Sequence, residues 1–212
     1  MIMFGLYVSV PIACFRKGLA REFLESEILP PPSTCYGFLL SLVGETDRRR
    51  HVGARVTAGL LNTTELSVVL RTVWRVKSKP LGSSGNTRPD FQQLLSGIEL
   101  AVWLDSSDEA GTVTLESRVR EAVVGRNFAA ISRFGGLSLG ESTHLVNDVL
   151  PLGEKYTNCG RTFLLSPRGR MTLPVWVDHV GSAGTRYSTG DVEECPSGPP
   201  AVDRMPRIEP PE

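Results

Sequence analysis

Gly135, Gly140 and Ser142 have the spacing of a phosphate-binding loop, in which glycines expose backbone amides and a lysine attracts the phosphates. Glu141 stands at the position where that motif requires the lysine. Because a carboxylate repels phosphate, the spacing does not predict binding of a nucleoside triphosphate. Two interpretations stay open, an ordinary turn and a segment whose bare backbone binds other phosphates.

The second interpretation involves the residues around that turn. Gly135 and Gly136 carry no side chain that would keep a phosphate from their amides. Arg133 and Ser138 flank them and can add a charge and a hydroxyl. The sequence therefore offers one candidate contact with an RNA backbone.

Basic side chains form a second candidate group. Period-two alternation over residues 65–77 places cations on one strand face and apolar residues on the other, and further cations lie nearby. For each of these cations the alternative interpretation is an ordinary surface charge that faces water. An open basic face suits a strand of nucleic acid. The candidates are Arg16, Lys17, Arg71, Arg75, Lys77, Lys79 and Arg88, and the apolar side of the same strand holds Leu66, Val68, Leu70, Trp74 and Val76.

The charges are uneven along a chain of zero formal net charge. Residues 1–100 hold 12 basic against 8 acidic residues, and residues 101–212 hold 11 against 15. A basic half indicates an anionic partner. Arginine supplies 19 of the 23 basic residues, which suits phosphate binding, although a coding bias explains it equally well. Arg48, Arg49 and Arg50 are interpreted as a solvated turn or a subunit contact outside the core site.

Three histidines raise the possibility of RNA cleavage, since a metal-independent cut needs a base, an acid and a cation near a 2′-hydroxyl. His51 follows the arginine triplet, His144 follows the glycine segment and His179 lies in an apolar strand. No two of them are spaced to suggest that they cooperate. RNA cleavage is therefore kept as the alternative to RNA binding without catalysis.

Composition favours a globular protein in the cytoplasm. The 212 residues are 41% hydrophobic, enough for a core. The first ten residues lack the basic region of a signal peptide, and no apolar run has the length of a membrane span. The four cysteines, Cys14, Cys35, Cys159 and Cys195, are scattered, which argues against a zinc site or a disulfide framework. No cofactor is expected.

Several elements can position these groups. Alternation over residues 2–10 predicts a strand that Pro11 ends. Residues 33–44 predict a helix with Ser33 or Thr34 as its cap, Gly44 as its stop, and an apolar stripe of Cys35, Phe38, Leu39 and Leu42. A second helix begins after Thr114 and ends at Gly125. Further strands are expected at 52–61, 65–77, 98–104, 161–166 and 170–179.

This order predicts an α+β fold, a ferredoxin-like antiparallel sheet of the kind on which RNA-recognition modules are built. Residues 1–134 would form that domain, with the polar stretch at about 78–97 projecting as a basic hairpin or thumb. Residues 135–187 would hold the glycine-rich loop and a small β-rich C-terminal region. Residues 188–212 are rich in proline and acid and predict an extended tail.

Three segments resemble a known family. They are similar to segments of the CRISPR-associated Cas-five family of the RAMP superfamily. The first is the Phe15-Arg16-Lys17 triplet followed by Pro30-Pro31-Pro32-Ser33-Thr34-Cys35-Tyr36-Gly37-Phe38, and the second runs from Phe134 to Ser142 (FGGLSLGES). The third runs from Leu173 to Gly181 (LPVWVDHVG) and resembles the family's DevS-type members. The resemblance spans residues 2–181. It covers most of the chain.

The resemblance implies a non-catalytic subunit of a type I Cascade surveillance complex that caps the 5′ handle of the CRISPR RNA (crRNA). The thumb would fold over the RNA, and Ser33, Thr34 and Tyr36 would join the RNA-binding residues named above. The implied partners are crRNA, the backbone subunit and the large subunit, with target DNA near the PAM-proximal end met only indirectly and no membrane. Some members of the family cleave guide precursors, so a metal-independent endoribonuclease that processes precursor crRNA is the alternative.

Overall fold

The fold is described from a computed structural model, which describes residues 3–18, 23–74, 84–153, 160–195 and 198–211. Three of the expected RNA-binding cations, Arg75, Lys77 and Lys79, lie outside the described residues.

Two α-helices and eleven strands are the main regular elements of the described residues. The helices are α1 (Pro32–Leu42) and α2 (Leu115–Val123). The strands are β1 (Phe4–Ala13), β2 (Phe15–Arg16), β3 (Phe23–Leu24), β4 (Ser26–Glu27), β5 (Arg55–Leu60), β6 (Glu65–Trp74), β7 (Thr87–Asp105), β8 (Asp148–Pro151), β9 (Gly160–Leu165), β10 (Met171–Trp176) and β11 (Arg186–Cys195).

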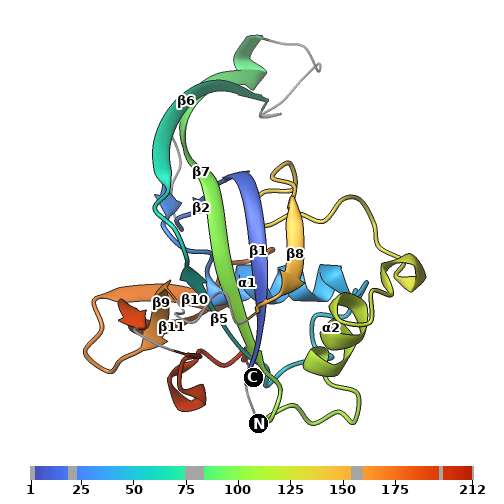
Figure 1. Ribbon diagram of the computed structural model, residues 1–212. Coiled ribbons are helices and arrows are strands. Elements are labelled where there is room, and N and C mark those ends of the chain that lie inside the picture. Colours follow the sequence, from blue (N-terminus) through green and yellow to red (C-terminus); the bar gives the residue numbers. More distant parts are fainter. Residues whose placement is uncertain (1–2, 19–22, 75–83, 154–159, 196–197, 212) are drawn as a thin grey trace.

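One nine-stranded sheet organises the protein (Figure 1). Its main path is β10-β11-β9-β5-β7-β1-β8, and β3 and β6 both pair with β7 beyond that path. Every pairing is antiparallel except that of β3 with β7. Helix α1 crosses one face behind β7 and β1 and packs against β5, β10 and α2. The expected α+β class is confirmed.

Strand β1 buries the face that its alternation predicts. Leu6, Val8 and Val10 are almost completely buried, while Tyr7 and Ser9 are partly exposed. The strand does not end at Pro11, however, but continues to Ala13. Strand β8 pairs only with Leu6–Ser9, so Pro11 lies where that side of β1 has become an edge, and an edge tolerates a residue without an amide hydrogen.

Helix α1 forms where the sequence predicts it, but its first turn differs. Cys35, Phe38, Leu39 and Leu42 are all buried, and Gly44 follows the helix with a φ of +67°. The expected cap at Ser33 or Thr34 is wrong: Pro31 is the N-cap and no side chain caps the helix. Proline fixes the helical φ at the first turn and dispenses with a donor, which lets the helix begin earlier.

Helix α2 begins as expected, with Thr114 Oγ1 accepting a hydrogen bond from the Ser117 amide at 3.2 Å. Its buried stripe contains Leu115, Val119, Ala122 and Val123. The stripe faces the same core as α1. Among the described residues, no helix is both long and apolar enough to cross a membrane.

The projecting hairpin is built by strands rather than by a long loop. Strand β7 begins at Thr87, and the register with β6 runs from Glu65 opposite Ser96 to Trp74 opposite Thr87. The strand expected at 98–104 therefore begins earlier, at residue 87, because the ladder with β6 satisfies the backbone of a segment whose polar composition looks like a loop. The hairpin rises above the sheet in Figure 1.

The apolar side of this hairpin faces solvent. Leu66, Val68 and Leu70 belong to the side of the strand that the alternation predicted to be apolar, and each is more than half exposed. Leu70 lies opposite Phe91, which is exposed as well. The other face, which carries Arg71 and Gln92, is the one turned towards the body of the protein. The described hairpin thus exposes an apolar strip.

The C-terminal part belongs to the same sheet and core. Strand β9 pairs with β5, and Phe163, Leu173 and Ile208 are fully buried in the main cluster. The extended tail expected over 188–212 is wrong in its described part: β11 pairs with β9 and β10. Beyond it, the Ile208 amide donates to Ala54 O at 2.8 Å and ties the segment to the strand edge.

Candidate nucleic-acid interface

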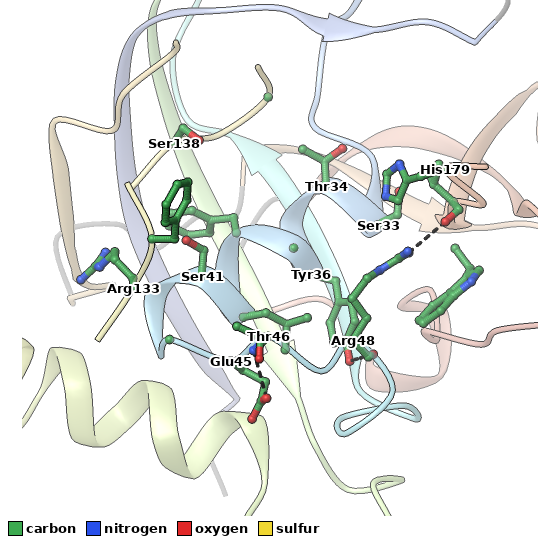
Figure 2. A pocket seen from close by; sticks show the side chains of 18 of the residues that line it. Ser33, Thr34, Tyr36, Ser41, Glu45, Thr46, Arg48, Arg133, Ser138 and His179 are labelled. Atoms are coloured by element: carbon green, nitrogen blue, oxygen red, sulfur yellow. Dashed lines mark hydrogen bonds between the residues drawn. The ribbon is translucent and has the colours of Figure 1, made fainter. Parts of the chain in front are cut away.

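A groove of about 770 Å³ runs along the outer face of α1 (Figure 2). We call it the α1 groove. The helix forms its floor, the segment before and within the glycine-rich region forms one wall, and the end of β10 forms the other. It is lined by Ser33, Thr34, Tyr36, Gly37, Phe38, Leu40, Ser41, Gly44, Glu45, Thr46, Arg48, Ser132, Arg133, Phe134, Ser138, Gly140, Val175, Trp176, Val177 and His179.

The floor is shallow because the outward residues of α1 are small. Ser33, Gly37 and Ser41 recur every four residues and therefore share one face of the helix. No atom lies within 4 Å of the position that a Cβ would take at Gly37. The opposite face is occupied by the buried stripe described above, so the helix is anchored on one side and open on the other.

The wall at the glycine-rich segment is held at two points. Leu139 is buried in the main core, and its amide donates to His144 O at 3.1 Å. At the other end, a side chain at Gly44 would clash with Ser132 O. Between these anchors Phe134, Gly135 and Gly136 are exposed. Gly135 has a φ of +75° and open space around it, so its backbone is accessible.

Arg48 closes the groove on the opposite side. Its guanidinium carbon lies 4.3 Å from the centre of the Trp176 ring, and Nη2 donates to Val177 O at 2.9 Å. The Tyr36 hydroxyl donates to Arg48 O at 2.8 Å and fixes the backbone of the same residue. Stacking and hydrogen bonding hold a planar cation in place while its remaining donors stay available.

Tyr36 is buried beneath the groove and holds the backbone of Arg48. Its side chain is 3% exposed, its hydroxyl is engaged with Arg48 O, and burial raises its pKa well above the usual range. Its structural role is to hold the backbone of Arg48 at the side of the groove.

The acid at the end of the groove is already neutralised. Glu45 accepts hydrogen bonds from the amides of Thr46 and Asp47 and pairs with Arg50 and Arg118. The Asp47 amide is the main reason that the pKa of Glu45 falls to about 2, and Arg118 adds to it. An anion entering the groove thus meets little uncompensated negative charge.

The three histidines have different surroundings. His51 is fully buried, and its Nε2 lies 3.1 Å from Arg118 Nη1. Because a guanidinium can only donate, Nε2 of His51 is the acceptor, and Nδ1 of His51 donates to Glu109 at 2.7 Å. His144 Nδ1 accepts from the Cys14 amide at 3.2 Å, and burial lowers the pKa of this imidazole. Of the three histidines, only His179 lines the α1 groove. It lies on a turn in which the Asp178 carboxylate accepts hydrogen bonds from three backbone amides.

The predicted RNA-binding residues separate into two places. Ser33, Thr34, Tyr36, Arg133 and Ser138 come together in the α1 groove. Arg133 and Ser138 lie on one side of α1, and Arg48 and His179 lie on the other (Figure 2). Gly135 and Gly136 adjoin the groove through Phe134. That these residues contact RNA stays a prediction.

The remaining predicted cations are outside the groove. Arg71 and Arg88 both lie on the hairpin. Arg71 pairs with Glu141 of the glycine-rich segment at 3.3 Å, and Arg88 pairs with Asp90 at 3.1 Å. Lys17 lies 3.9 Å from Glu25, and its neighbour Arg16 lies in β2. Of the three cations that the alternation placed on one face, only Arg71 belongs to the described residues, so the open basic face stays a prediction.

Sequence reasoning missed Arg48, Phe134 and His179 as groove residues. Arg48 was interpreted as part of a solvated turn, and only its position directly after the helix stop at Gly44 could have placed it at the groove. His179 follows the end of β10, which could have been recognised as a sheet edge next to the helix.

Comparison with known proteins agrees with this fold. No protein-family model matches the chain. A curated protein named CRISPR-associated protein Cas5, from Myxococcus xanthus (strain DK1622), is 54% identical over 211 residues that cover 97% of each chain. A chain of a solved CRISPR RNA-guided surveillance complex has a TM-score of 0.57 at 14% identity, over 94% of this chain and 91% of that one, which shows a shared fold. On the identity to the curated relative, this chain belongs to the CRISPR-associated Cas5 family.

Proposed function

We propose that this protein is a subunit of a type I CRISPR surveillance complex and that it holds the 5′ handle of the crRNA in the α1 groove. The observation that carries the proposal is the groove itself, whose floor consists of small residues, whose lining carries hydroxyls, and whose two sides carry Arg48 and Arg133 (Figure 2). Hydroxyls and guanidinium groups suit the phosphates, 2′-hydroxyls and base edges of a single strand. The accessible backbone at Gly135 adds amides.

The arrangement of the core supports this assignment. Apart from β2–β4 and β6, the elements follow in the order β1-α1-β5-β7-α2-β8, with β5-β7-β1-β8 side by side, and this order supports the ferredoxin-like layout that we propose. Family membership and the shared fold support a place beside a backbone subunit and a large subunit. The exposed strip of Leu66, Val68, Leu70 and Phe91 is a surface of the kind that a neighbouring subunit covers.

The protein would act by holding its ligand. In a holding role, His144 and Tyr36 serve as structural hydrogen-bond partners of backbone groups, as their contacts suggest. The endoribonuclease alternative needs a base and an acid that both reach one 2′-hydroxyl. It is separated from holding by incubating the full chain with precursor crRNA in a chelator, where uncut RNA is the expected result.

The binding test compares the repeat-derived 5′ handle with a scrambled RNA of equal length. We expect tighter binding of the handle across several salt concentrations, because base contacts survive salt that screens phosphate contacts. Equal affinity for both RNAs at every salt concentration would refute handle recognition. Site-specific cutting would instead establish the processing role.

A further inference from the structure

The side chain of Phe134 is fully exposed although it lines the α1 groove. Its position is nevertheless defined, because Ser132 lies against Gly44 on one side and Leu139 is buried on the other. A ring held in water between two fixed anchors contributes nothing to the core. It is a platform on which a flat apolar surface can stack.

The floor of the same groove leaves room for such a surface. Gly37 lies in the middle of α1, is exposed, and has no atom within 4 Å of the position that a Cβ would take. Glycine inside a helix is less stable than alanine, so this position costs the fold stability without a packing reason. A ligand that approaches the helix closely would account for a residue without a side chain.

The remaining lining indicates what kind of surface fits. Hydroxyl-bearing Ser41 and Ser138 line the groove and suit a partner with its own donors and acceptors. Glu45, the one acid among the described lining residues, is occupied by Arg50 and Arg118. A planar heterocycle with polar edges matches this lining better than an aliphatic side chain of another protein.

We propose that Phe134 stacks on one nucleobase of the bound strand and that Gly37 provides the space for that base. The proposal rests on the proposed function, because it requires RNA in the α1 groove. It deepens that function by assigning one base subsite, read by stacking, beside the phosphate contacts of Arg48 and Arg133. The neighbouring serine hydroxyls then lie where they can meet the polar edge of the base.

The test measures the affinity of the full chain for a fluorescent handle RNA and for a series of the same RNA in which one nucleotide at a time is abasic. Phe134→Ala should weaken binding of the intact RNA by about fivefold to a hundredfold, the range for loss of one stacked base. Phe134→Trp should retain binding. One abasic position should weaken the unmodified protein by the same factor and weaken Phe134→Ala no further.

A second variant keeps the test independent of the exposed ring. Gly37→Leu should weaken the intact RNA and should lose its effect on the RNA with the same abasic position. Urea unfolding of both variants checks the fold, and neither is expected to lose stability, because Phe134 is fully exposed and Gly37 has open space around it.

The outcomes separate the two levels of the account. If Phe134→Ala binds intact RNA within twofold of the unmodified protein, or if every abasic position costs both proteins alike, the stacking proposal is wrong while handle binding stands. Loss of a co-purifying subunit with unchanged RNA affinity would also overturn it and assign Phe134 to a protein contact. If the unmodified protein fails to prefer the handle, the proposed function fails first.

Discussion

Arg71 and Glu141 form an ion pair with 3.3 Å between Nη1 and Oε2, and this pair joins the projecting hairpin to the glycine-rich segment. Gln92 Nε2 donates to the second carboxylate oxygen at 3.0 Å. Glu141 is the residue that stands where a nucleotide-binding loop has its lysine. Its carboxylate therefore fixes two parts of the protein that are 49 residues or more apart in sequence.

Glu141→Gln should increase affinity for RNA by a few-fold at low salt. The change removes a negative charge beside the accessible glycine backbone and releases Arg71, while an amide oxygen can still accept from Gln92. Stability should change by less than about 1 kcal/mol, because the ion pair is partly exposed. Fluorescence anisotropy at two salt concentrations checks this, with Asp203→Asn on the C-terminal turn as the matched charge control. A gain for both variants alike would show only a general charge effect.

Arg48→Lys should weaken RNA binding although the charge is kept. Lysine cannot reproduce a planar cation stacked on Trp176 and bonded to Val177 O, so the donors are no longer held towards the groove. Arg48→Ala should weaken binding at least as much. Titration with handle RNA measures both, and Arg126→Lys, at an exposed position after α2, is the control. Full affinity in Arg48→Lys would mean that charge alone matters at this place.

The contribution of Glu45 to stability should depend on pH. Its folded-state pKa of about 2 lies below the ordinary value of 4.5, so its stabilising effect is complete above about pH 4.5 and is lost as the pH falls towards 2. Glu45→Gln should therefore lower the free energy of unfolding at pH 7, and the difference from the unmodified protein should shrink at pH 3. Urea unfolding at both values measures it. A difference that is the same at both pH values would contradict the assignment of the low pKa.

Gly37→Ala and Gly44→Ala should have opposite effects on stability. Alanine at Gly37 meets no atom and should raise the free energy of unfolding by about 0.5–1 kcal/mol. Alanine at Gly44 must adopt a positive φ and clashes with Ser132 O, so it should cost at least about 1 kcal/mol. Thermal or urea unfolding of the pair gives the comparison. A loss at Gly37 would show that this face of α1 is packed and not open.

The sequence predicted the elements whose burial follows a regular period. The alternation in β1 and the stripe of α1 each identify one buried face, and Thr114 caps α2 as its side chain allows. Such patterns can be recognised without tertiary information because burial of one face imposes them.

Elements that depend on long-range pairing could not be predicted in the same way. Residues 87–97 are strand because β6 lies beside them, and nothing local in Arg88-Pro89 indicates this. Met205 packs with Ala101 and Trp103, and Ile208 joins the main core, although both are isolated among prolines and charges, so no period could reveal them. A single apolar residue signals burial only once its neighbour in space is known.

The candidate site was predicted only in part for a related reason. The resemblance named Ser33, Thr34, Arg133 and Ser138 as RNA-binding residues but no groove, and the groove that they line exists because α1 lies between the glycine-rich segment and β10. Arg48 joins it through Trp176, more than 120 residues away in sequence. The two described cations of the hairpin, Arg71 and Arg88, are paired within the protein, since acids that alternation cannot locate lie next to them.

The most direct test locates the RNA on the protein. The full chain would be bound to handle RNA that carries photoreactive 4-thiouridine, irradiated, and digested for identification of the crosslinked peptides. Crosslinks should fall in residues 33–48 and 131–142, on the two sides of the α1 groove. Crosslinks confined to the surface of β9, β10 and β11, with none in those two segments, would contradict the assignment of the groove as the RNA-binding site.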